Sequence, residues 1–247
     1  MLSSKYRKRL AVLVVIILLL LGGVLGVTIA YFQDHTEVIK NTFAPGVLFI
    51  DPDTQFTLQE QAVVEAAVGS ATKYVLGTGV DNDGFEYTVL PGVKIPKRPY
   101  IKVDKLLIEA YLYVVVDTKG AFTRSSNNTQ WTSTDGKISW AMASGWTFLK
   151  AQGNKAIYYY TAKSSDGKLP AGTYSNINIM QQSDGMSITV ASDYNYTNNT
   201  NNTKGSAVKF DIDFKAYMCQ RGANDVTLTV EQAWEANFKT QVETDFK

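Results

Sequence analysis

The chain contains only one cysteine, Cys219, and only one histidine, His35, among its 247 residues. A single cysteine excludes an intrachain disulfide, and we interpret Cys219 as an ordinary strand residue. A catalytic zinc ion usually takes three protein ligands, most often with two or more histidines, and no H-E-x-x-H motif occurs. The same scarcity leaves no Ser-His-Asp arrangement. The sequence therefore predicts a protein that is not an enzyme and has no cofactor or metal site; His35 with carboxylates is the one metal alternative.

Other features that resemble cation sites have simpler interpretations. DNDGFE (81–86) begins like a calcium loop but lacks the later acidic positions, and we interpret it as a turn. Asp211 and Asp213 share one face of a predicted strand, where we expect solvated carboxylates rather than a bound cation. No glycine-rich phosphate loop follows a strand and opens a helix.

Acidic residues are absent from the first 30 positions, where four basic residues precede an apolar run: Lys5, Arg7, Lys8 and Arg9. Without this segment the chain carries 20 basic and 23 acidic side chains, a formal charge of −3. Such a mildly acidic body argues against nucleic acid as the main partner, because phosphate binding needs clustered Lys and Arg. A hydrophobic content of 45% with 19% charged residues is typical of a folded domain.

The N-terminal segment has the organisation of a secretory signal peptide. The basic residues are followed by 12 apolar ones, Leu10–Leu21, and three glycines then interrupt the helix: Gly22, Gly23 and Gly26. Thr28 and Ala30 occupy the −3 and −1 places of a small-residue cleavage site. We therefore predict that residues 1–30 are a signal peptide, removed by a cut before Tyr31.

An uncleaved membrane anchor is the alternative for this segment. Leu10–Ala30 is 21 residues long, enough to cross the hydrocarbon core of a bilayer. In either case the rest of the chain lies on the outer side of the membrane, because the basic flank stays in the cytoplasm. We expect the protein to be secreted or held at the cell surface, with the membrane contacted only through this segment.

The body of the chain has the patterns of a mainly β protein. In VKFDIDFKAYM (208–218) apolar residues alternate with polar ones, and EAYLYVVVD (109–117) is apolar enough for a central strand buried on both faces. Shorter candidate strands are KAIYYYTA (155–162), SNINIM (175–180) and MSITVAS (186–192). Turn signals separate them: DNDG (81–84), TDGK (134–137), SDGK (165–168) and QSDG (182–185). We predict an antiparallel, jelly-roll-like β-sandwich over residues 47–247.

Two segments have helical character. LQEQAVVEAAV (58–68) is rich in alanine and other helix formers, so we expect a helical insert near residues 58–76. Near the C-terminus, Thr229 and Gln232 have the spacing of a capping box. They precede an apolar stripe: Val230, Trp234, Phe238 and Val242. We predict a helix over 229–243 that packs on the sheet.

The passage NYTNNTNNT (195–203) is polar and repetitive, and we interpret it as a solvated surface loop. It contains N-x-T sequons at Asn195, Asn198 and Asn201, and one more lies at Asn127. In a cell with N-glycosylation such sequons are acceptor sites for glycans.

The stretch GVTIAYFQDHTEVIKNTFAPGVL (26–48) resembles the start of the TasA/camelysin family of exported Gram-positive matrix proteins. That family shows a pattern close to A-Y-F-x-D followed by N-x-F-x-x-G. The matching residues here are Ala30, Tyr31, Phe32, Asp34, Asn41, Phe43 and Gly46. Later blocks also resemble the family in the same order: TVLPGVKIPKRPYIKV (88–103), EAYLYVVVD (109–117), GWTFL (145–149), AIYYY (156–160), and KAYMCQ with EQAW between 215 and 234.

The resemblance implies a jelly-roll sandwich, export through a specialised signal peptidase of the SipW type, and service as a structural subunit of extracellular fibres in a biofilm matrix. It also implies donor-strand complementation, in which the freed segment 31–46 leaves its own subunit and completes the sheet of the next. The donor residues would be Tyr31, Phe32, Asp34, Val38, Ile39 and Phe43. Head-to-tail addition gives an open filament. The partners are neighbouring subunits, the signal peptidase and a minor anchor or tip protein.

Three alternatives remain open at this point. The first strand of a self-contained sandwich would show the same residues as a donated strand. A monomeric binding module anchored by Leu10–Ala30 would also be exported. Camelysin-type relatives have been assigned to metallopeptidases, which makes a protease the most distant alternative.

Overall fold

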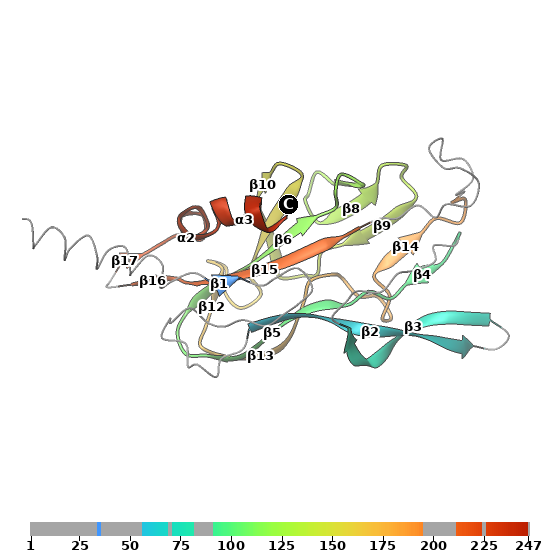
Figure 1. Cartoon of the computed structure of the whole chain (residues 1–247), viewed down its shortest axis with the longest axis horizontal. Coiled ribbons are helices and arrows are strands. Elements are labelled where there is room, and N and C mark those ends of the chain that lie inside the picture. The colour runs from blue at the N-terminus through green and yellow to red at the C-terminus, as the bar shows by residue number, and fades with distance from the viewer. Residues whose placement is uncertain are drawn as a thin grey trace, which may run out of the picture.

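The computed structural model describes residues 34–35, 56–68, 71–81, 91–194, 211–223 and 226–246. These residues form a mainly β protein with antiparallel sheets and two short helices, which confirms the prediction of a mainly β class and is consistent with a β-sandwich (Figure 1). The predicted signal peptide, residues 1–30, lies outside the described residues. Within the described part of the chain, no helix has the length and apolar character needed to cross a membrane.

The strands form three sheets and a small ribbon. The first sheet has the order β1 (Asp34–His35), β15 (Asp213–Gln220), β6 (Ala110–Asp117), β11 (Lys155–Tyr160) and β10 (Trp146–Gln152), and β12 (Lys168–Leu169) also pairs with β6. The second has the order β13 (Gly172–Asn178), β5 (Pro99–Leu106), β2 (Phe56–Val68) and β3 (Ala71–Asp81). The third has the order β4 (Lys94–Ile95), β14 (Ile188–Val190), β9 (Ile138–Ala141), β8 (Gln130–Ser133) and β7 (Phe122–Arg124). The ribbon pairs β16 (Gly222–Ala223) with β17 (Val226–Thr227).

Strand β6 lies between two hydrophobic clusters, which explains its unbroken apolar sequence. Successive side chains of a strand point to opposite faces. Leu112, Val114 and Val116 enter the main core, whereas Tyr111, Tyr113 and Val115 enter a second cluster beneath the helices. Every residue of β6 is buried, as predicted for this central strand. In Figure 1 the helices lie on one side of the sheet that contains β6 and β15, and β5 and β13 lie on the other.

The C-terminal region forms two helices instead of the single one predicted over 229–243: α2 (Val230–Asn237) and α3 (Lys239–Asp245). The predicted capping box is present, with Thr229 and Gln232 bonding reciprocally. The helix is interrupted at Phe238, whose φ of −122° and ψ of −12° depart from helical values. The ring of Phe238 is fully buried with Trp234 and Val242, so the stripe does pack on the sheet.

The prediction of a helical insert near residues 58–76 is wrong, because strands β2 and β3 pair here as an antiparallel hairpin. Residues Phe56–Glu60 pair with β5, and Phe56 and Leu58 enter the main core. Residues Val63–Val68 pair with β3, and no other described strand adjoins them. Helix propensity is a weak prior that strand pairing overrides. The far part of the hairpin extends beyond the body of the molecule (Figure 1).

Candidate assembly site at the edge of a sheet

Strand β15 is fully paired on one side. All eight of its residues, Asp213–Gln220, have partners in β6. On the opposite side, which we call the β15 edge, the described part of the chain provides partners for Met218 and Tyr217, and these are Asp34 and His35 of β1. No other strand among the described residues pairs with this edge. Its unpaired backbone groups are a template for an added strand.

The side chains of β15 that point to the core are apolar and packed. Phe214, Ala216 and Met218 point into the main core, as the alternation of the sequence predicts. The Phe214 ring lies edge-on to Trp140, with 5.9 Å between the ring centroids. Val208 and Phe210, predicted for the same face, lie outside the described residues. An extended peptide that pairs with the β15 edge would therefore extend the sheet next to a well-packed core.

The opposite face of β15 is covered by the helices and carries a buried ion pair. The Lys215 Nζ lies 2.9 Å from the Asp245 Oδ2, and the two side chains are 4% and 10% exposed. The Tyr217 hydroxyl donates a hydrogen bond of 2.8 Å to the same carboxylate. Burial and the nearby Asp245 charge both raise the pKa of Tyr217, so its hydroxyl stays protonated as a donor. These contacts fix α3 over the strand next to β1.

The cation beside Asp213 is a lysine ammonium. The Lys119 Nζ lies 2.9 Å from the Asp213 Oδ2, and this hydrogen bond raises the pKa of Lys119 above its usual value. Asp211 is exposed, as expected for a solvated carboxylate. No group of three His, Cys, Asp or Glu residues that could hold a metal ion occurs in the described part of the chain.

The predicted site residues fall into two groups. Asp34 lies in β1 opposite Met218, and His35 lies opposite Tyr217 in the same chain. The remaining predicted cleavage and donor residues lie outside the described residues: Thr28, Ala30, Tyr31, Phe32, Val38, Ile39 and Phe43. The pairing of β1 is within one molecule, as in the self-contained sandwich. It also identifies β15 as the strand with which Asp34 and His35 pair.

The β15 edge and the ion pair beneath the helices were not predicted from the sequence. A signal for the second face was present, because KAYMC (215–219) is apolar at nearly every position, as in a strand covered on both sides. The partner of Lys215 is Asp245, 30 positions later, and no local pattern connects the two. The edge position of β15 depends on the strand order of the whole sheet.

Cys219 provides a measure of how tightly the helices cover this face. Its side chain is 1% exposed in the cluster beneath the helices, and burial raises the pKa of the thiol to about 12. The thiolate is the reactive form. We therefore expect native protein at pH 8 to resist maleimide labelling, and the unfolded chain to be labelled within minutes. Rapid labelling of the native protein would contradict the packing described here.

Comparisons with protein-family models, with curated proteins and with solved structures found no match.

Proposed function

We propose that this protein is a structural subunit of an extracellular fibre, which grows when the N-terminal segment of one subunit occupies the β15 edge of the next. The observation that supports this most directly is the place of β1 at the end of its sheet, where Asp34 and His35 pair with Met218 and Tyr217 of β15. The same pairing, made with the β15 of a neighbour, would link two subunits. The proposal includes cleavage near Ala30, secretion and a jelly-roll topology.

The register of β1 predicts how a donated strand would lie. Asp34 is opposite Met218 and His35 is opposite Tyr217, in antiparallel order. If a neighbour's strand continues this register, Val38 comes opposite Phe214 and lies on the core side. Phe32 falls on the same side of the donated strand, because it lies six positions before Val38 and side chains an even number of positions apart point to the same face.

The energies are sufficient for a stable fibre if the acceptor edge is already formed. Each added backbone hydrogen bond contributes about 1 kcal/mol net. Burial of Phe32 and Val38 would add roughly 2 kcal/mol each. Ordering of the donor peptide opposes these gains. The packed core and the helices hold the acceptor strand in place before assembly, which reduces the cost on that side.

Mixed cross-linking distinguishes donation from pairing within one chain. One batch of subunits carries Asp34→Cys and a second carries Met218→Cys, and the two are mixed before assembly. Residues directly opposite in an antiparallel pair are close enough for a disulfide. If strands are donated, oxidised mixed fibres should give covalent dimers on denaturing gels. Buried Cys219 should not react, because its thiol is protected.

Fibres of either single variant provide the matched controls and should remain monomeric on the same gels. The double variant should give a ladder of covalent multimers if the strand is donated. A double variant that forms fibres yet gives only an internally bridged monomer would refute the proposal. N-terminal sequencing of the fibre protein should begin at Tyr31, whereas a full-length membrane-bound monomer would support the anchored binding module.

A further inference from the structure

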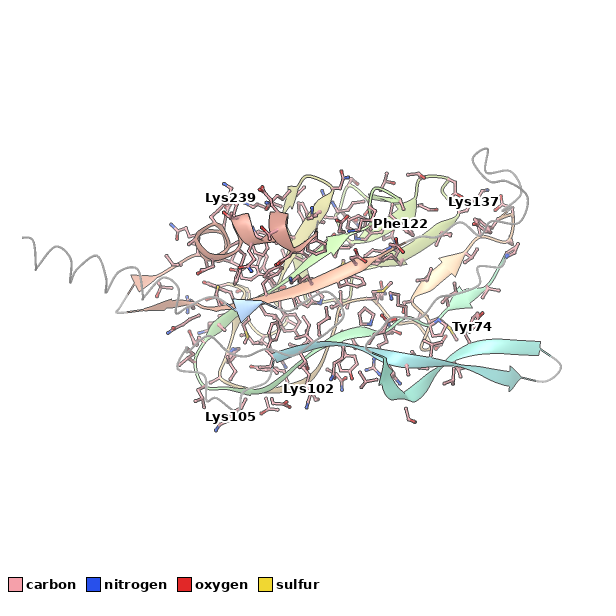
Figure 2. The ribbon with its side chains drawn as sticks, in the orientation of Figure 1. Tyr74, Lys102, Lys105, Phe122, Lys137 and Lys239 are labelled. Atoms are coloured by element: carbon pink, nitrogen blue, oxygen red, sulfur yellow. The ribbon has the colours of Figure 1, made fainter. Side chains whose placement is uncertain are left out.

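The turn between β7 and β8 presents an N-glycosylation sequon on the surface. The sequon is Asn127-Asn128-Thr129, and the side chains of Asn127 and Thr129 are both exposed. The turn follows β7, which begins at Phe122, labelled in Figure 2 on the part of the molecule away from the β2–β3 hairpin. Of the sequons in the sequence, this one lies in the described residues.

The side chain of Asn127 is oriented by the residues of its own sequon. Its Oδ1 accepts hydrogen bonds from the Thr129 backbone N–H at 3.3 Å and from the Thr129 hydroxyl at 3.0 Å. The Ser125 hydroxyl donates to the same oxygen at 2.6 Å. A backbone N–H can only donate, so the atom that faces it is the amide oxygen. The amide nitrogen, Nδ2, has no hydrogen-bond partner among the described residues and is left to solvent.

This hydrogen-bond pattern suits a nucleophilic amide nitrogen. An amide nitrogen is a poor nucleophile because its lone pair is shared with the carbonyl group. Hydrogen bonds to the amide oxygen increase the acidity of the N–H protons and favour their removal as the nitrogen attacks. The hydroxyl of Thr129 supplies such a bond, and serine is the other residue that can supply it from the same position.

The turn is held in place by the body of the protein. The hydroxyl of Tyr158, a residue only 1% exposed, donates a hydrogen bond of 2.9 Å to the Asn128 carbonyl. Ser125 and Gln130 close the turn, with the Ser125 N–H donating to the Gln130 carbonyl at 2.9 Å. The acceptor side chain is therefore displayed from a fixed turn rather than from a loose loop.

We propose that Asn127 is the acceptor of an N-linked glycan. The donor class is an oligosaccharide whose anomeric carbon is bonded to a polyprenyl phosphate or diphosphate. The Asn127 Nδ2 attacks the anomeric carbon, the new N–C bond forms, and the C–O bond to the phosphate breaks. The phosphate group leaves with that electron pair, and a base of the transferase takes the amide proton. This inference rests on the export that the proposed function requires, and is independent of polymerisation.

A glycan at this position has a structural consequence. Strand β7 is the edge strand of its sheet, and β8 is its partner within the described residues. Exposed sheet edges invite pairing with other chains. A hydrated glycan on the adjoining turn would hinder such sideways contacts. The β15 edge belongs to a different sheet.

Peptide mass mapping of the protein purified from the cells that produce it tests the inference. The peptide that contains Asn127 should carry an added glycan mass in most molecules. Thr129→Ala should abolish that mass, whereas Thr129→Ser should retain it. Asn154 is the matched control, because it is also exposed in a strand-connecting turn but is followed by Lys155 and Ala156 and forms no sequon.

An unmodified Asn127 in the native protein would overturn the inference, as would a glycan that persists in the Thr129→Ala variant. The fibre assay is scored separately with Asn127→Gln. Fibres assembled from a native protein with a bare Asn127 would refute the glycan and leave the proposed function intact. A glycosylated chain that never polymerises would refute the proposed function and leave the glycan inference intact.

Discussion

A chain that lacks Tyr31–Lys40 is expected to remain a folded, soluble monomer and to form no filaments. The proposed function places this segment on a neighbouring subunit, and within the described residues its pairing with the body is that of Asp34 and His35 with Met218 and Tyr217. At about 1 kcal/mol per backbone hydrogen bond, its loss should cost the body roughly 1–2 kcal/mol. That corresponds to a decrease in melting temperature of less than about 8 °C for a domain of this size. Thermal unfolding, sedimentation and negative-stain microscopy measure the three outcomes.

The control for this deletion keeps the length of the segment and changes its pattern. Phe32→Asp and Val38→Asp should each weaken assembly at least tenfold while leaving the melting temperature nearly unchanged, because both side chains are expected on the core side of the donated strand. Ile39→Asp should have a smaller effect, because the register places it on the other side. Aggregation or loss of fold in the deletion would show that the first strand is an integral part of its own sandwich.

Among the substitutions proposed for this protein, Asp245→Ala is expected to cause the largest decrease in the free energy of unfolding. Asp245→Ala leaves the Lys215 ammonium buried without its partner and also removes the acceptor of the Tyr217 hydroxyl. Breaking a buried ion pair at one side typically costs about 3–5 kcal/mol. Chemical denaturation of the variant and the parent measures the change in the free energy of unfolding.

Two further variants show whether the cause is the buried charge. Lys215→Met combined with Asp245→Leu removes both charges and should recover most of the lost stability, because apolar replacement of a buried pair is often neutral. Lys239→Ala breaks a surface pair with Glu235, where Lys239 is 61% exposed, and should change stability by less than about 1 kcal/mol. Similar losses for Asp245→Ala and Lys239→Ala would contradict the role assigned to the buried pair.

Patterns that arise from burial on both faces were predictable from the sequence. The apolar run that became β6 and the alternation of Phe214, Ala216 and Met218 are direct results of side chains pointing to alternate faces. The C-terminal apolar stripe and its capping box were also predictable, because both depend on residues that are three or four positions apart in the sequence. The break at Phe238 was not predicted, since no proline or glycine marks it in the sequence.

Features that depend on distant partners were not predictable. The segment 58–68 has helix-forming composition, yet Val63–Val68 find partners in β3 and Phe56–Glu60 find partners in β5. The resemblance of the N-terminal segment suggested a role in assembly but did not indicate which strand pairs with Asp34 and His35. That position follows from the order of strands, which places β15 beside β1 at the end of the sheet.

The β2–β3 hairpin gives the molecule two regions of unequal cooperativity. Among the described residues its far half is supported by a single ladder, and Val64 is 45% exposed there. A two-stranded ribbon of this kind is marginally stable by itself in water. Its amide protons should therefore exchange through small local openings that leave the aromatic core intact. We therefore expect a melting curve of this protein to report the body, while the pairing of Val63–Val68 with β3 is lost and regained locally.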